Sequence, residues 1–151
     1  MAASPWSIYN TFKRYMGDGT CDLDADTFRM ALFTSASNAA TATLSTLGSV
    51  TNQVSAANGY LTGGKTLTGV TWSTGASAGE MRFDGTATIW SASGGNIVNI
   101  RYVVLYDEST GTSAGNRKLV ANSALSTGQF TVTAGNTLTV TPSANGIFEL
   151  N

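Results

Sequence analysis

The feature that most constrains the fold is a succession of short segments in which apolar and polar residues alternate. Turn residues separate these segments, such as Asn58-Gly59, Ser93-Gly94-Gly95 and Asn145-Gly146. Alternation with a period of two, bounded by Gly and Asn, is typical of β-strands with one face buried. The expected strands are 27–33, 65–67, 70–73, 80–83, 87–90, 96–106, 118–124, 129–133, 137–141 and 146–150.

This series of strands predicts the fold class. Many short strands at such spacing, without helices long enough for parallel crossovers, indicate a mostly β protein with antiparallel pairing. We expect a jelly-roll-like β-sandwich. The segment 97–106 is apolar on both faces, which predicts a place at the centre of a sheet. Alternating threonines in 129–141 predict a half-exposed hairpin, since β-branched Thr suits the solvated face of a strand.

The N-terminal segment has a different period. Ser4-Pro5 is a good helix start, because Ser caps a helix and Pro fits the first turn. An apolar stripe with helical spacing follows, and Gly17 is the expected left-handed cap. We therefore expect one amphipathic helix over about 5–16 and a β-sandwich over about 27–151, within a single domain 1–151. The helix could pack on its own sandwich or dock on a partner.

Composition excludes several classes of function. The chain has no histidine and one cysteine, which removes Ser-His and Cys-His catalysis and any disulfide within the chain. With 8 basic and 9 acidic residues the net charge is −1, so no nucleic acid or membrane partner is expected. The longest run of large apolar residues, 102–106, is too short to span a membrane. We expect a protein that is not an enzyme and has no cofactor.

Three aspartates suggest a calcium loop at first sight. Asp22, Asp24 and Asp26 alternate, but an EF-hand needs Gly at its sixth position and Glu at its twelfth. The sequence has Thr27 and Phe33 there. We therefore expect a solvated turn and no metal site. The nearby Cys21 should have a raised pKa because of its acidic neighbours, which makes it a poor nucleophile.

Aromatic residues offer the remaining candidate surface. Tyr60, Trp72 and Trp90 could form a platform for sugar, although such residues are more often core or interface anchors. Aromatic enrichment also marks the centres of protein interfaces. The candidate interface residues are Trp6, Tyr9, Phe12, Tyr15, Met16, Tyr60 and Trp72.

Several motifs in order along the chain carry a resemblance to a known family. They are Tyr9-Asn10-x-Phe12-Lys13, Asp22-Leu23-Asp24-x-Asp26-Thr27-Phe28-x-Met30-Ala31-Leu32-Phe33-Thr34-Ser35, Thr51-Asn52-x-Val54, Gly59-Tyr60-x-x-Gly63-Gly64, Val70-Thr71-Trp72, Phe83, Trp90, Ile100-Arg101-Tyr102-x-Val104-x-Tyr106-Asp107 and Ala144-Asn145-Gly146-Ile147-Phe148. Together they resemble small virion structural proteins of tailed bacteriophages, and the resemblance spans nearly the whole chain.

The resemblance implies a structural role without catalytic residues. Small β-rich phage proteins of this size commonly decorate or cement the capsid, so the expected partner is the major capsid protein, bound by a homo-oligomer (a dimer or trimer). The expected location is the exterior of the capsid, after synthesis in the host cytoplasm. The alternative is a tail-associated protein, or a tip module that binds a receptor or glycan.

Overall fold

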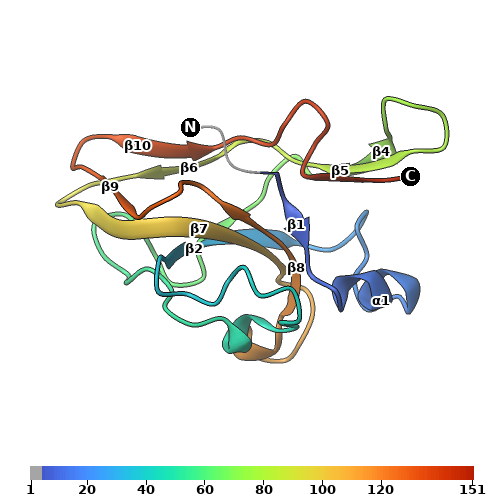
Figure 1. Cartoon of the computed structure of the whole chain (residues 1–151), viewed down its shortest axis with the longest axis horizontal. Helices are drawn as coiled ribbons and strands as arrows, with labels where there is room; N and C mark the ends of the chain where they lie inside the picture. Colours follow the sequence, from blue (N-terminus) through green and yellow to red (C-terminus); the bar gives the residue numbers. More distant parts are fainter. Residues whose placement is uncertain (1–4) are drawn as a thin grey trace.

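Antiparallel strand pairing organises residues 5–151, the part of the chain that this computed structural model describes (Figure 1). The elements are β1 (Ser7–Ile8), α1 (Phe12–Gly17), β2 (Phe28–Thr34), the 3-10 turn η1 (Leu47–Ser49), β3 (Lys65–Thr66), β4 (Thr71–Thr74), β5 (Met81–Asp84), β6 (Thr88–Ser91), β7 (Ile97–Asp107), the 3-10 turn η2 (Ala114–Asn116), β8 (Lys118–Ala124), β9 (Phe130–Val132), β10 (Thr137–Val140) and β11 (Phe148–Leu150). The prediction of a mostly β, antiparallel sandwich with one N-terminal helix is confirmed.

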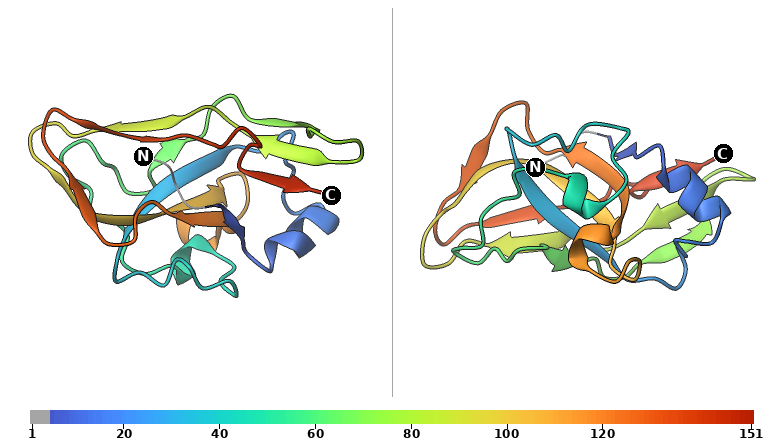
Figure 2. Two further views of the ribbon diagram at one scale, coloured as in Figure 1. Left: turned by 45° about the horizontal axis from the view of Figure 1, so that its top comes forward. Right: turned by 90° about the horizontal axis from the view of Figure 1, so that it is seen from below.

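Two layers of strands form the sandwich (Figures 1 and 2). The main sheet has the order β1-β8-β7-β2-β3. β9 pairs with the N-terminal end of β7, ahead of the part that pairs with β8. The second layer consists of the pair β10-β6 and the three-stranded sheet β11-β5-β4. The predicted central position of the longest strand, β7, is confirmed, since it pairs with β2, β8 and β9.

Each predicted strand is present, and its observed limits lie within about two residues of the predicted ones, because turn residues mark where the strands end. The segment 118–124 matches β8 at both ends. Phe28, Met30 and Leu32 of β2 point to one face, and Ala31 and Phe33 point to the other, as the alternation predicts.

The N-terminal prediction is wrong in its extent. Ser7 and Ile8 pair with Asn122 and Ala121 as strand β1, and α1 covers only Phe12–Gly17. The exposed edge of β8 supplies backbone partners that the local sequence does not reveal. The expected cap at Ser4 lies outside the described residues. Gly17 does not have the expected positive φ, which occurs instead at Gly19 (75°).

The predicted hairpin over 129–141 is also wrong. β9 pairs with β7 of the main sheet, whereas β10 pairs with β6 of the second layer, so the two strands belong to different layers. The alternation itself is confirmed: Val132, Leu138 and Val140 are buried. The pattern identifies which face of each strand is buried, but not the strand with which it pairs.

The main core lies between the layers, on what we call the inner face of the main sheet. Aromatic rings dominate it. The ring centroid of Phe83 lies 5.0 Å from that of Phe28 and 5.2 Å from that of Phe148, and Phe12 of α1 contacts Phe148 at 5.8 Å. These contacts join the second layer to β2 and to the helix.

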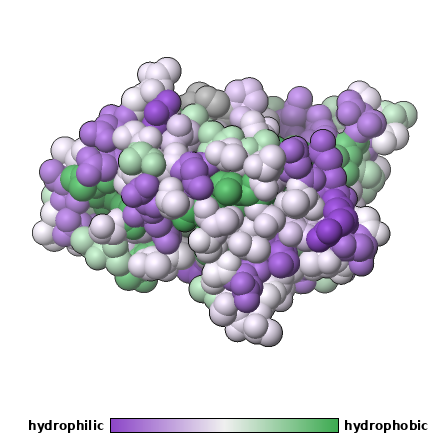
Figure 3. Space-filling view, turned by 60° about the horizontal axis from the view of Figure 1, so that its bottom comes forward, coloured by the Kyte–Doolittle hydropathy of each residue, from purple (hydrophilic) through white to green (hydrophobic). Residues whose placement is uncertain are grey.

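The opposite, outer face of the main sheet is covered by the long connection between β2 and β3. Within residues 44–54, the only helical element is η1. Leu44, Leu47 and Val50 pack from this connection onto a second buried cluster that includes Phe33 and Tyr106. Figure 3 shows this side of the molecule as largely polar, with apolar side chains in small separated patches. No helix in the described part of the chain is long and apolar enough to cross a membrane.

Candidate docking groove

A groove of about 540 Å³ opens between α1, the turn that follows it, and the three-stranded sheet. Figure 1 shows α1 on the same side of the molecule as β4, β5 and the C-terminus. The apolar residues of the groove are Met16, Leu23, Trp72 and Leu150. Lys13, Asp22 and Asp24 add charged side chains of both signs to the lining. We call this site the docking groove.

Packing of the helix positions one wall of the groove. Phe12 and Tyr15 are buried in the core, which leaves Lys13 exposed and Met16 half-buried at the groove. The opposite wall is Trp72 of β4, which is paired with Phe83 and has its ring centroid 6.4 Å from that of Phe148. The groove is therefore an opening at the end of the inner core.

The free edge of β4 borders this site. β4 pairs only with β5 among the described strands, in a register that places Trp72 opposite Phe83 and Ser73 opposite Arg82. Gly75 donates its N–H to Glu80 O (2.8 Å), so alternation along an antiparallel pair directs the backbone groups of Trp72 and Thr74 away from β5. Such an edge is a template for pairing with another chain.

The structure brings together two of the seven candidate interface residues. Met16 and Trp72 both line the groove, and Trp6 lies half-buried against the inner core. The other four are buried and form no exposed surface: Tyr9, Phe12, Tyr15 and Tyr60. The stripe of the helix therefore packs on its own sandwich, which was one of the two alternatives.

Tyr60 shows what the buried aromatic residues do instead. Its hydroxyl accepts a hydrogen bond from Leu32 N (2.9 Å) and one from the Gln53 amide (2.8 Å), which ties the β2–β3 connection to β2. Trp90 is also fully buried. The sugar platform is thus not formed, and of its three residues only Trp72 is partly exposed.

The three aspartates fold back on their own turn. Asp22 N donates to the Asp26 carboxylate (2.7 Å), and Asp24 N donates to the Asp22 carboxylate (3.0 Å). Among the described residues, no group of His, Cys, Asp and Glu side chains is arranged to hold a metal ion.

A buried acid beside the groove is absent from the sequence prediction. Asp107, at the end of β7, is fully buried; one carboxylate oxygen accepts from Ser109 N (2.8 Å), and the other accepts no hydrogen bond of good geometry. Burial raises the pKa of Asp107 to about 7, and the nearby Asp26 carboxyl adds to this rise. Asp107 lies two residues after Leu105 and four after Val103, and the side chains of both point inward. This alternation was the signal that could have identified Asp107 as buried.

Cys21 lies beside this acid and lines the docking groove. Burial raises the pKa of the Cys21 thiol well above its usual range, and Asp107 raises it further. The predicted direction of the shift is confirmed, although burial contributes more than the acidic neighbours. The thiol is therefore neutral and acts as a small apolar group in the wall.

The groove places an apolar lining beside the unpaired backbone groups at the edge of β4. Comparison of the protein with family models, with curated proteins and with solved structures gives no match. The resemblance to phage virion proteins therefore rests on the sequence motifs.

Proposed function

We propose that the protein is a non-enzymatic virion structural protein that binds the outer surface of a phage capsid and stabilises the shell. The single observation that carries the proposal is the position of the docking groove beside the free edge of β4. Together they offer backbone hydrogen bonds and an apolar pocket to one extended segment of a partner.

The mode of binding follows from these two features. An extended segment of the major capsid protein adds to β4 as a further antiparallel strand, with backbone partners at Trp72 and Thr74. One apolar side chain of this segment enters the groove between Met16 and Trp72. Charges of both signs at Lys13, Asp22 and Asp24 select polar groups on either side of it.

Residues of the family resemblance support the proposal through the fold. The Tyr106 hydroxyl donates to Gly63 O (2.8 Å), the Tyr60 hydroxyl is bonded to β2, and Phe148 stacks on Phe83. These motif residues hold the layers and connections together. Because the motif residues have these roles in the fold of this protein, the sequence resemblance favours a structural task.

Oligomerisation would strengthen such binding. One strand and one side chain give a modest affinity, whereas a dimer or trimer that spans neighbouring capsid subunits makes its second contact at high effective concentration. With a net charge of −1, attachment rests on apolar and backbone contacts and should change little with added salt.

Particles with and without the protein provide the test. We expect particles that lack it to assemble but to release DNA at lower temperature, and the purified protein to restore them. Thr74→Pro removes the outward N–H of β4 and should abolish rescue, because proline cannot donate to an added strand. Thr74→Ala keeps the N–H and is the matched control, and circular dichroism verifies that both variants fold.

Copy number separates the two locations in the particle. Stained gels of purified particles should show the protein in shell-like abundance. A handful of copies per particle, or depleted particles that keep shell stability but do not adsorb to cells, would replace the capsid proposal with the tail-associated alternative.

A further inference from the structure

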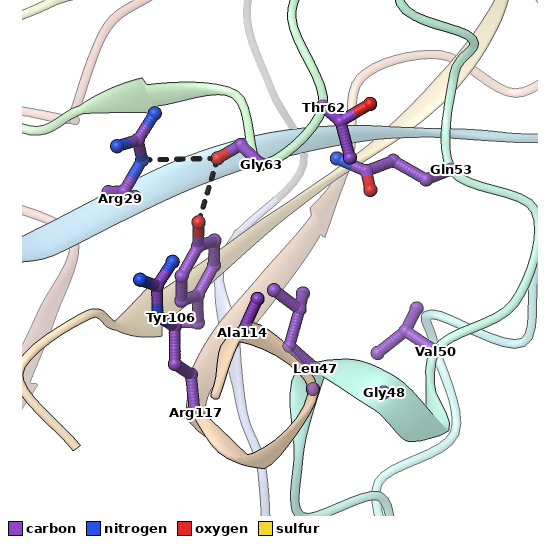
Figure 4. A pocket seen from close by; sticks show the side chains of 11 residues that line it. Arg29, Leu47, Gly48, Val50, Gln53, Thr62, Gly63, Tyr106, Ala114 and Arg117 are labelled. Atoms are coloured by element: carbon purple, nitrogen blue, oxygen red, sulfur yellow. Dashed lines mark hydrogen bonds between the residues drawn. The ribbon is translucent and has the colours of Figure 1, made fainter. Parts of the chain in front are cut away.

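A second concave site lies on the outer face of the main sheet, away from the docking groove. This pocket has a volume of about 360 Å³ and lies between η1, η2 and the connection that leads into β3 (Figure 4). We call it the arginine pocket, because Arg29 and Arg117 are the charged residues that line it.

The charges at this pocket do not balance. Arg29 and Arg117 each lie 3.2 Å from the same Glu108 carboxylate oxygen, and all three side chains are only 25% exposed. Two guanidinium groups share one carboxylate, which leaves one net positive charge in a largely desolvated place. Such a charge is stabilised by an anion that enters the site.

The two arginines have different remaining capacity. Arg29 donates to Gly63 O (3.3 Å), to Gly64 O (2.7 Å) and to Glu108, so it holds the connection and the sheet together. Among the described residues, Arg117 makes one ion pair, with Glu108, and one side-chain hydrogen bond with Tyr106, and its guanidinium carbon lies 6.0 Å from the centroid of the Tyr106 ring. Figure 4 shows its guanidinium group beside Tyr106. A guanidinium has five N–H donors, so these contacts leave some of them unused. Arg117 therefore retains donors for a ligand.

The side opposite Arg29 is built partly from the two 3-10 turns and is only partly apolar, since Gln53 and Thr62 add polar groups to the lining. Leu47 and Val50 line it, and the two turns touch at Gly48 and Gly115. A Cβ atom on Gly48 would lie 2.9 Å from Gly115 O, so the absence of a side chain allows the turns to close the wall. The pocket thus combines a cationic side with a partly apolar side, which is the composition of small-molecule sites.

We infer that the arginine pocket binds a small monoanionic organic acid, with its carboxylate on Arg117 and its apolar body against Leu47 and Val50. One carboxylate neutralises the excess charge and makes paired hydrogen bonds with the planar guanidinium. The inference is independent of the proposed function, because the docking groove lies on the other face of the sheet.

Benzoate is the probe, and benzyl alcohol is the neutral compound of similar size. We expect benzoate to shift the backbone amide resonances of Gly48, Gly63 and Gly115 in a saturable way, and benzyl alcohol not to do so. Binding should weaken only modestly when sodium chloride is raised to about 0.5 M, because salt screens the attraction of partly buried charges less than that of exposed ones.

Arg117→Gln is the decisive variant, since it removes the charge and keeps most of the side-chain volume. Loss of a charge-assisted hydrogen bond should weaken benzoate binding by about tenfold or more. Arg82→Gln is the matched control: Arg82 is also buried to a similar degree and paired with one carboxylate, that of Glu149, but lies in the second layer. It should bind benzoate as the unmodified protein does.

Two results would overturn the inference. One is the absence of saturable shifts at the three glycines when the benzoate concentration is about 20 times the expected Kd. A single charged contact gives a Kd in the millimolar range. The other is equal binding of benzoate by Arg117→Gln and Arg82→Gln. The first result is read on the unmodified protein, so the test does not depend on the folding of a variant.

Discussion

The two faces of the main sheet are stabilised in different ways. On the inner face, the second β layer covers the sheet, and the ring centroid of Phe83 lies 5.0 Å from that of Phe28 and 5.2 Å from that of Phe148. On the outer face, a connection with little regular structure covers the sheet. It is held by individual polar contacts, such as the Tyr9 hydroxyl to Ala39 O (2.6 Å) and Asn38 to Ser49 O (3.0 Å).

This difference separates stability from recognition. Burial of large side chains contributes about 1.5–3 kcal/mol each, so the inner face supplies most of the apolar stabilisation. The outer connection contributes fewer large groups, but its turns place the arginine pocket on a rigid sheet. Recognition sites are commonly built this way, on loops that a packed scaffold positions.

The largest expected effect is on the inner face. Phe83→Ala should lower the free energy of unfolding by about 3–5 kcal/mol, because it removes a fully buried ring that joins two layers. Val50→Ala, on the half-buried outer connection, should cost about 1 kcal/mol. Urea denaturation measures both values. Equal losses would contradict the distinction between the faces.

The next effect concerns the point where the outer connection meets β2. Gly64 has φ +69°, and a Cβ atom there would lie 1.8 Å from Met30 O, so Gly64→Ala should cost about 3 kcal/mol. Gly135→Ala is the control: Gly135 also has a positive φ (83°), but no atom lies within 4 Å of its added Cβ. It should cost about 1 kcal/mol, from the backbone alone. If the two variants unfold at the same denaturant concentration, close approach at Gly64 is not what holds the connection.

Asp107 is the polar exception on the inner face, and it gives that face a pH dependence. The folded pKa of about 7 lies above the ordinary value of 3.8, so the folded protein binds this proton more tightly than the unfolded chain does. The contribution of this proton to the free energy of unfolding is complete below about pH 4 and is lost as pH rises to about 7. The facing groups are Cys21, Asp26 and Ser109.

Asp107→Asn should therefore stabilise the protein at pH 8 by on the order of 2 kcal/mol and change little at pH 4. Thermal unfolding across this range measures the difference. Asp24→Asn is the control, because Asp24 is exposed on the turn that contains Asp26, the neighbour of Asp107. A constant difference between Asp107→Asn and the unmodified protein at all pH values would exclude titration of this carboxyl.

The sequence predicts the inner face better than the outer face. Strand positions follow from local alternation and turns, as the matching limits of β8 illustrate. β1 was missed because its pairing depends on the distant edge of β8. For the same reason β9 and β10 were assigned to one hairpin, although their partners lie in separate layers.

Residues of the two candidate sites were harder to predict because distant segments of the chain bring them together. Met16 and Trp72 were identified as interface candidates by type, whereas Leu150 joins them only through the pairing of β11 with β5. Arg29 and Glu108 are 79 residues apart, and no local pattern indicates that Arg117 shares the same carboxylate. Composition identifies the side chains that can bind, but the topology selects those that meet.

The smallest effect tests the outer face directly. The Tyr9 hydroxyl is buried and donates to Ala39 O, and burial raises the pKa of Tyr9, so the group remains a neutral donor. Tyr9→Phe keeps the ring but leaves the carbonyl of Ala39 without this donor, which should cost about 1 kcal/mol of global stability. Tyr102→Phe is the control, because Tyr102 is half-buried and no hydrogen bond of its hydroxyl occurs within the described residues.

Hydrogen exchange should locate the effect of Tyr9→Phe. Amides of residues 38–52 should exchange faster in this variant, because polar contacts hold the outer connection locally. Amides of β7 should change only as far as global stability changes. Uniform acceleration in both segments would mean that the connection and the sheet unfold as one unit, and that the two faces do not differ in the way proposed.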